Sequence, residues 1–403
     1  MQDFPFTIRD IAGIMNLHIR HRNTVSLDVD CPFCGDRKGK LNLNLKKNVF
    51  KCNRCGESGG MLALYGKVYG VDNQTACREI KDALGRNEMA PSYQVIYKQI
   101  EAQEPEIENS PPASNEIKHK TYSMLFSMLI LAESHRKNLL KRGLTEEKIE
   151  QNGYKSTPVF GFKKLTRKLV EAGCIIKGVP GFYQDEDGEW TIYFNPKSSG
   201  YMVPVRNIEG LIVGIQIRLD HPYDGRKYIW LSSVNFHMGV SSGSPVHLVG
   251  ESGAKVVFVT EGPLKGDVAH FLSGRTFACV PGANQYANLA SFLKTMKALG
   301  TEFVYEAYDM DKLLKPVCKG DYNEKCQYCE HYRKNWKNSI IHCEKKQLKR
   351  KNIQHGCNKL AEICRALKLS GKSLTWDLDE DGDWAEHVKG VDDYLVDLDQ
   401  KKN

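Results

Sequence analysis

The stretch KVVFVTEGPLKGD, from Lys255 to Asp267, joins a continuous apolar run to an acidic turn. Val256–Val259 is apolar at every position, which is typical of a strand buried on both faces of a parallel sheet. Glu261 comes directly after this strand, and the acidic pair Asp309 and Asp311 comes directly after a later predicted strand. This stretch therefore predicts a buried strand that ends in a carboxylate.

Apolar strand patterns and helical patterns alternate through the C-terminal third of the chain. That alternation predicts a parallel sheet with helices on its faces. The predicted elements are helix 268–272, strand 276–280, helix 289–299, strand 302–308, helix 359–367 and strand 373–376.

The region before this sheet has a different pattern. Helical patterns cover 122–141 and 146–151, with Thr145 as a plausible N-cap, and strand-like runs follow at 191–194, 202–206 and 211–218. The last two runs are expected to form a hairpin through Asn207–Gly210. The fold class is therefore α+β and multidomain.

The carboxylates after the two strands predict a metal site. The carboxyl ends of parallel strands meet at one edge of a sheet, so Glu261, Asp309 and Asp311 are expected to lie together. Carboxylates held that close need a cation, and oxygen ligands favour Mg²⁺ or Mn²⁺ over zinc. Mg²⁺ held by few carboxylates keeps positions open for phosphate oxygens, which suits nucleotidyl transfer.

With 403 residues, the chain is long enough for two or three domains. We predict a first domain at 1–86, a polar linker rich in Glu, Pro and Ser at 87–116, and two further regions at 117–250 and 251–403. No stretch is apolar enough to span a membrane, and the N-terminus lacks the pattern of a secretion signal. A cytoplasmic location without membrane partners is expected.

The net charge of +8 is concentrated in one segment. Between Lys312 and Lys368 there are 15 Lys/Arg against 5 Asp/Glu, a local +10, so the remaining chain sums to −2. Such a segment attracts nucleic-acid phosphates, although a solvated basic loop has the same composition.

Thirteen cysteines in a chain of the reducing cytosol favour metal binding over disulfides. Four of them form two C-x2-C pairs separated by 17 residues, and a glycine follows each pair, which is the pattern of a zinc ribbon with closed, structural zinc. Lysines and Arg54 flank Phe50 there and could offer cations and a stacking face to single-stranded nucleic acid. The predicted zinc ligands are Cys31, Cys34, Cys52 and Cys55.

A second group of cysteines lies within the basic segment. A second zinc site, an iron–sulfur cluster and inert thiols are all compatible with its spacing, and zinc is the preferred interpretation. Whichever metal binds would stabilise an insertion, about 312–358, that lacks a core of its own. The residues concerned are Cys318, Cys326, Cys329 and Cys343.

The order of these motifs resembles that of bacterial DnaG-type primases. The N-terminal cysteines resemble the CHC2-like zinc-binding domain, 201–228 resembles the first half of the primase polymerase core, and 255–267, 280–282 and 309–311 resemble a Toprim domain. The resemblance covers most of 25–310 and, more loosely, 389–395.

This resemblance implies roles for individual residues. Glu261, Asp309 and Asp311 would be catalytic metal ligands, and Glu261 would also assist proton transfer. Asp392 would be a further acidic residue of the magnesium site. The residues that would contact template or nucleotide phosphates are Arg206, Arg218, Lys227 and Lys265.

Two positions depart from the family's acidic pattern. Lys265 stands where these primases have an aspartate, and Gly390 replaces an acid of the later motif, so the number of bound ions is open. The Glu-Gly-x-x-Lys-x-Asp form is more similar to Toprim proteins of phages and mobile elements. The helicase-binding domain of replicative primases is not expected after Asn403, which points to a helicase acting in trans or to another route of recruitment.

The leading hypothesis is a DNA primase, a nucleotidyltransferase that makes short primers on single-stranded DNA from nucleoside triphosphates. A Toprim nuclease using the same carboxylates and a non-catalytic nucleic-acid-binding protein of a mobile element are the alternatives. The choice of ribo- or deoxynucleotides, the start site, the primer length and the oligomeric state are left open.

Overall fold

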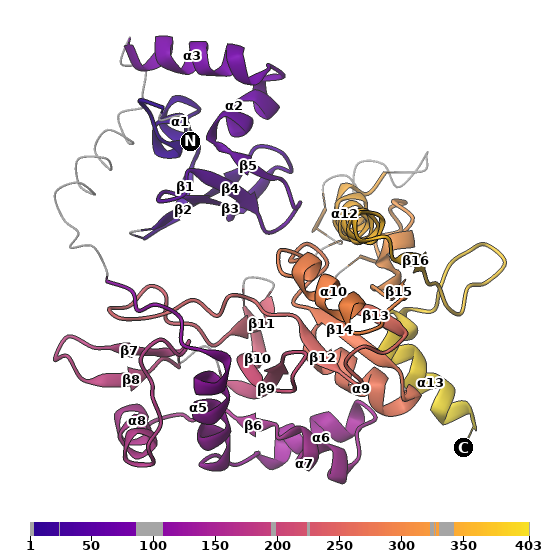
Figure 1. Ribbon diagram of the computed structural model, residues 1–403. Coiled ribbons are helices and arrows are strands. Elements are labelled where there is room, and N and C mark those ends of the chain that lie inside the picture. The colour runs from indigo at the N-terminus through magenta and orange to yellow at the C-terminus, as the bar shows by residue number, and fades with distance from the viewer. Residues whose placement is uncertain are drawn as a thin grey trace. The chain divides into compact units, whose positions relative to one another are not determined.

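A computed structural model describes residues 4–23, 25–85, 108–194, 199–223, 226–322, 326, 328–329 and 342–402 (Figure 1). The chain forms two compact units, Met1–Ile107 and Glu108–Asn403, each described by itself. None of the described helices is both long enough and apolar enough to cross a membrane.

The first unit is an antiparallel sheet in the order β1-β2-β3-β4-β5, with three helices around it. Leucines at alternate positions of β3 face inward, together with Phe50 and the helix residues Ile8 and Ile80, and they form one core. The elements are α1 (Ile8–Ile14), β1 (Ile19–Arg22), β2 (Ser26–Cys31), β3 (Asp36–Asn44), β4 (Val49–Cys52), β5 (Ser58–Gly60), α2 (Met61–Tyr69) and α3 (Asn73–Gly85).

The second unit begins with helices around a four-stranded antiparallel sheet of order β11-β10-β9-β6. One face of this sheet packs on α5 and α8, and the other face of β9 packs on α6, α7 and α9. The elements are α5 (Asn115–Ser127), α6 (Glu133–Lys141), α7 (Glu146–Asn152), β6 (Lys155–Ser156), α8 (Phe162–Glu171), β7 (Phe182–Gln184), β8 (Trp190–Ile192), β9 (Gly200–Arg206), β10 (Ile212–Tyr223) and β11 (Arg226–Trp230).

A five-stranded sheet of order β12-β14-β13-β15-β16 follows, parallel except at β12. The predicted parallel sheet is thus confirmed. Its elements are β12 (His247–Val249), β13 (Val256–Glu261), α9 (Pro263–Ser273), β14 (Thr276–Val280), α10 (Leu289–Ala298), β15 (Phe303–Glu306), η2 (Met310–Leu313), α12 (Glu344–Leu367), β16 (Ser370–Ser373), η4 (Glu386–Val388) and α13 (Val391–Lys402).

Helices cover both faces of this sheet (Figure 1). Alternate residues of β13 face α10 and α12 on one side, and Phe258 faces α13 on the other. On that second side α9 crosses close to β14. Glycine at position 266 permits this approach, since a Cβ there would collide with the thiol of Cys279. This close approach holds the start of α9 beside the carboxyl end of β13.

The structure corrects four predicted boundaries. The predicted helix 122–141 is two helices, and the predicted helix 359–367 begins already at Glu344, inside the basic insertion. The predicted strand 373–376 lies three residues earlier, at β16. The predicted linker, 87–116, is too long at its end, since Glu108 accepts a hydrogen bond from Met238 N and Ala113 N donates to Gly178 O. Polar residues can also make backbone hydrogen bonds, and these bonds hold the end of the predicted linker on the second unit. The first part of the predicted linker, up to 107, lies outside the described residues.

Candidate active site

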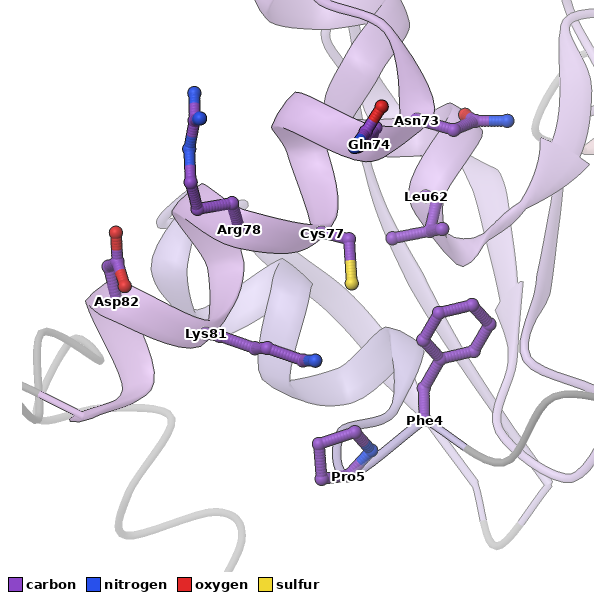
Figure 2. A pocket seen from close by; sticks show the side chains of 9 residues that line it. All are labelled: Phe4, Pro5, Leu62, Asn73, Gln74, Cys77, Arg78, Lys81 and Asp82. Carbon is purple, nitrogen blue, oxygen red and sulfur yellow. The ribbon is translucent and has the colours of Figure 1, made fainter.

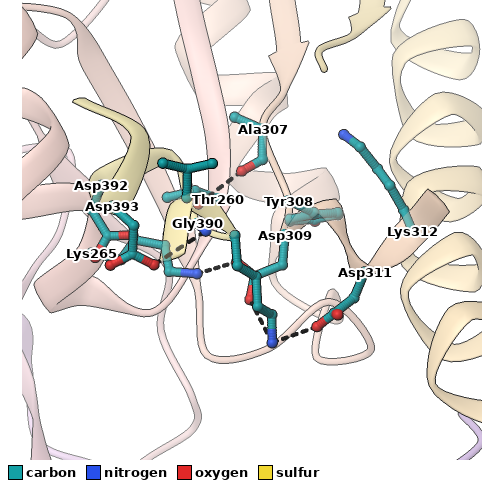
Figure 3. A network of polar contacts seen from close by, with 12 residues as sticks. Thr260, Lys265, Ala307, Tyr308, Asp309, Asp311, Lys312, Gly390, Asp392 and Asp393 are labelled. Carbon is teal, nitrogen blue, oxygen red and sulfur yellow. Dashed lines mark hydrogen bonds and ion pairs between the residues drawn. The ribbon is translucent and has the colours of Figure 1, made fainter. Parts of the chain in front are cut away.

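The fold places the two predicted acidic motifs at the same edge of the five-stranded sheet. β13 and β15 are adjacent and parallel, and the Thr260 hydroxyl donates to Ala307 O at 3.0 Å, which ties their ends together (Figure 3). Glu261 ends β13, while Asp309 and Asp311 follow β15. The prediction that these motifs meet at one sheet edge is therefore confirmed.

Three ammonium groups lie against the aspartates. Lys265 forms an ion pair with Asp309 Oδ1, and Lys389 bridges the pair, 3.5 Å from Asp309 Oδ2 and in contact with Asp311 Oδ2. Lys349, from α12, lies 2.8 Å from the same oxygen of Asp311. Among the described residues, Glu261, Asp309 and Asp311 are not close enough together to form a group within 4.8 Å. The ammonium of Lys389 lies between the two aspartates.

The pKa values follow from this arrangement. Burial, and then the neighbouring charge of Asp309, raises the pKa of Glu261 to about 7. Burial also opposes ionisation of Asp309, but Lys265 and Lys389 hold its pKa below the ordinary value. Among the described residues, the buried Oε1 of Glu261 has no hydrogen-bond partner, so one oxygen is available for a cation.

Asp392 reaches this site from the start of α13. It is 4% exposed, and burial raises its pKa to about 6. Its Oδ2 lies 3.9 Å from Nη1 of Arg142, and both residues line a cavity of about 340 Å³. The structure thus brings the predicted Asp392 beside an arginine to which the sequence assigned no role.

The predicted basic residues do not all gather here. Arg218 stacks over the ring of Tyr228, 5.4 Å from its centroid, and Tyr228 in turn is in electrostatic range of Arg142. Lys227 is exposed and adjacent to Tyr228 in β11, so it faces the other side of that sheet. Arg206 donates to Gly210 O at 3.3 Å instead. Among the described residues, none of these three forms an ion pair or hydrogen bond with the carboxylates of the acidic edge.

Several lysines of the basic insertion are less available to bind nucleic acid than the composition of the segment suggests. Lys312 is 4% exposed and forms an ion pair with Glu306. The buried Lys346 forms an ion pair with Asp321, in which Nζ lies 2.7 Å from Oδ1. Lys349 contacts Asp311. Four of the remaining twelve basic residues from Lys312 to Lys368, namely Lys325, Arg333, Lys334 and Lys337, lie outside the described residues.

The first cysteine cluster has the geometry of a zinc site. All four sulfurs lie within 4.8 Å of one another, with 3.8 Å from Cys31 to Cys55 and 4.0 Å from Cys34 to Cys52. A tetrahedron with Zn–S bonds of about 2.3 Å has edges of roughly 3.8 Å. Arg54 N and Cys55 N both donate to the sulfur of Cys52 at 3.4 Å. These cysteines therefore fit structural zinc.

One expectation for this unit is wrong. Phe50 offers no stacking face to nucleic acid, because it is 2% exposed and stacks on Phe33 inside the core. The alternation of β4 turns Val49 and Lys51 outward and Phe50 inward. Arg54 lies 3.3 Å from the buried Asp36.

The second cysteine cluster is not assembled in the same way. Within the part of the chain that the structure describes, the first cluster is the one group of three or more His, Cys, Asp or Glu side chains close enough to share an ion. The positions Cys318, Cys326, Cys329 and Cys343 are described but form no such group. A metal there stays a prediction.

A separate hollow of about 680 Å³ lies in the first unit, where α2 and α3 meet the N-terminal segment (Figure 2). Phe4 and Leu62 form apolar walls, and Arg78 and Lys81 of α3 stand beside them. None of the predicted site residues lines it.

Three residues at the acidic edge had no predicted role there: Arg142, Lys349 and Lys389. Lys389 stands next to the acidic motif 390–393, which is a signal that the sequence offers. Arg142 and Lys349 lie far from the aspartates along the chain, and only the packing of α6 and α12 brings them near.

No protein-family model matches the chain. A DNA primase of Lactococcus lactis is 25% identical over 205 residues, which cover 49% of this chain and 28% of that protein. The match thus spans less than a third of the curated relative's length.

Among solved structures, the zinc-binding and RNA polymerase domains of the Aquifex aeolicus primase align with 98% of this chain and 84% of that chain, at 13% identity and a TM-score of 0.44. The RNA polymerase domain of Mycobacterium tuberculosis DnaG, in complex with a double-stranded DNA oligomer with an overhang, aligns with 50% of this chain and 66% of that one, at 16% identity and a TM-score of 0.38. The sequence match, which covers about half of this chain, is therefore to a bacterial DNA primase.

Proposed function

We propose that this protein is a DNA primase that synthesises short primers on single-stranded DNA with a divalent metal ion. The observation that carries the proposal is the meeting of Glu261, Asp309 and Asp311 at the carboxyl ends of adjacent parallel strands, with cations already held between the aspartates. The relationship to a primase of known name supports the choice of reaction. We infer that the five-stranded sheet is a Toprim domain.

A divalent ion fits the place that Lys389 takes. That ammonium contacts one oxygen of each aspartate, so a cation is accepted there, and the unpartnered Oε1 of Glu261 is a further oxygen ligand. When bound, Mg²⁺ or Mn²⁺ would lower the pKa of a primer 3′-hydroxyl and stabilise charge on the attacked phosphate. Lys389 would then turn outward, since its side chain is already 32% exposed.

The residues of the chain have separate tasks in this proposal. Glu261 would hold the ion and would also assist the transfer of the proton that the hydroxyl loses. Arg142, which lines a cavity together with Asp392, and Arg218, which lies over the ring of Tyr228, would bind phosphates of the template or of a nucleoside triphosphate. Lys349 and Lys389 would bind the phosphates of the incoming nucleotide.

The zinc-bearing unit would position the template rather than take part in the chemistry, because a closed shell of four cysteine thiolates leaves no open position on the ion. A helicase partner in trans and an origin in a mobile element remain predictions from the sequence.

The decisive experiment is primer synthesis by the full chain on single-stranded DNA with labelled nucleotides and Mg²⁺ or Mn²⁺. Short, template-dependent products are expected from the wild type. Products should be lost in Glu261→Gln and Asp309→Asn, because each removes one metal ligand. Glu302→Gln is the matched control: this exposed carboxylate lies at the opposite end of the same sheet, paired with Lys255, and its removal should leave the yield unchanged.

Other outcomes favour the alternatives. Metal-dependent shortening of the template, without product growth, would indicate a nuclease that uses the same carboxylates. Neither activity, with binding of single-stranded DNA intact, would indicate a nucleic-acid-binding protein.

A further inference from the structure

Lys265 occupies an unfavourable place for a cation. It is the third residue of α9, and the N-terminal end of a helix carries partial positive charge, which disfavours an ammonium group there. The side chain is also only 19% exposed. Something in the surroundings must offset both costs.

Neighbouring carboxylates provide that compensation. Lys265 forms an ion pair with Asp309. Figure 3 shows the ammonium pointing from α9 toward Asp309, with Asp392 and Asp393 on its other side. The ammonium is therefore held inside the acidic site and not at its rim.

Gly390 makes room for this ammonium. A Cβ at position 390 would lie 2.5 Å from Oδ1 of Asp392 and 3.1 Å from Nζ of Lys265. A side chain at 390 would therefore displace the carboxylate of Asp392 and move the ammonium by a few tenths of an ångström. Positions 265 and 390 are the two at which the sequence departs from the acidic pattern that it resembles, and they are neighbours in the fold. The lysine at 265 and the glycine at 390 are compatible because the glycine has no side chain near the ammonium.

The two oxygens of Asp309 are used differently. Lys265 contacts Oδ1, whereas Lys389 approaches Oδ2 and bridges to Asp311. Lys389 is more exposed than Lys265 and can leave for solvent, but Lys265 is fixed by the first turn of α9. One ion can replace Lys389 while Lys265 stays in place.

We propose that the ammonium of Lys265 is a built-in cation that takes the place of a second divalent ion. The acidic site then binds one Mg²⁺ or Mn²⁺, held by Glu261, Asp309 and Asp311. This inference rests on the proposed metal-dependent function and specifies the number of ions.

The test is to count Mn²⁺ ions bound to the zinc-loaded full chain by electron paramagnetic resonance, without nucleotide or DNA. The wild type should bind one ion, which is lost in the double variant Glu261→Gln/Asp311→Asn. Lys265→Asp, which exchanges the cation for a ligand, should bind two. Lys389→Met is the matched control: it removes the neighbouring ammonium and should still bind one.

Lys265→Met serves as a second variant if Lys265→Asp does not fold. It removes the charge without adding a ligand, and it should take up a second ion roughly tenfold more weakly than the first, about 1.4 kcal/mol. Two ions in the wild type, both lost in the double variant, would overturn the role of Lys265 and leave the primase proposal intact. A single ion in both Lys265 variants would also overturn it. No bound ion in the wild type would remove the metal site itself, and the primase proposal with it.

Discussion

The ammonium of Lys312 lies 2.9 and 3.0 Å from the two carboxylate oxygens of Glu306, and both side chains are about 5% exposed. Glu306 ends β15, and Lys312 lies in η2, so the pair closes the loop that carries Asp309 and Asp311. Lys312 also donates to Leu374 O and stands 5.7 Å from the ring centre of Trp376. The position of the aspartates therefore depends on a buried ion pair beneath them.

Lys312→Met should destabilise the second unit by about 3 to 5 kcal/mol, because it leaves the carboxylate of Glu306 buried without its cation. Urea unfolding followed by circular dichroism measures this. Adding Glu306→Gln should recover part of the loss. Lys315→Met is the control, since Lys315 is 48% exposed against Asp383 and should cost less than about 1 kcal/mol. Equal losses in the two single variants would contradict the importance of burial.

Glu261→Gln should stabilise the protein at alkaline pH in buffer without added divalent ions. Folding raises the pKa of Glu261 from 4.5 to about 7, so the folded state holds the proton more tightly than the unfolded chain. The contribution of this group to stability is therefore present below pH 4.5 and is lost as the pH rises toward 7. Glutamine carries no charge, so the melting temperature of the Glu261→Gln variant at pH 8 should exceed that of the wild type by several degrees. The shift is on the order of 3 °C for each kcal/mol of added stability.

Thermal unfolding at pH 4.5 and at pH 8 checks this, and the difference should shrink at the lower pH. The same pKa predicts that Mn²⁺ binds more weakly at pH 6 than at pH 8, because the ion competes with a proton for Glu261. A pH-independent affinity would count against Glu261 as a ligand.

Lys349→Met should increase the affinity for Mn²⁺ roughly twofold to fivefold, since Lys349 competes for Asp311 and partly exposed pairs of this kind contribute up to about 1 kcal/mol. The KM for nucleotide should rise at the same time if Lys349 binds phosphate. Isothermal titration and steady-state kinetics separate the two effects. Lys345→Met, on the exposed face of α12, should change neither quantity.

Cys52→Ser should release zinc and unfold the first unit while the second unit stays folded. Cys31 and Cys52 belong to the core of the first unit, whose small size makes the metal important for its stability. A colorimetric zinc assay and limited proteolysis, with fragments identified by mass, measure the two effects. Cys77→Ser, outside the cluster, is the control and should keep its zinc. Loss of both units together would show that they do not fold independently.

Much of the fold followed from local patterns. The run 256–259 specified a buried strand because every residue is apolar, and strand 276–280 has the bounds that the sequence predicts. Thr145 caps α7, accepting a hydrogen bond from Lys148 N as expected of that residue type. The helix α12 was underestimated because its first half is rich in lysine and lacks an apolar stripe, so nothing in its composition separated it from a basic loop.

By itself the sequence determined the C-x2-C pairs, the order of strands and helices, and the carboxylates at the strand ends, since each depends on neighbours along the chain. Only the tertiary structure decided which charges meet. Lys265 and Gly390 are distant in sequence, but α9 and the start of α13 bring them so close that a Cβ at 390 would lie 3.1 Å from the ammonium. Likewise, Phe50 stands among lysines in the sequence, and only the packing of the first unit turned it inward. Ion pairs and burial depend on distances between elements, and no local pattern encodes those distances.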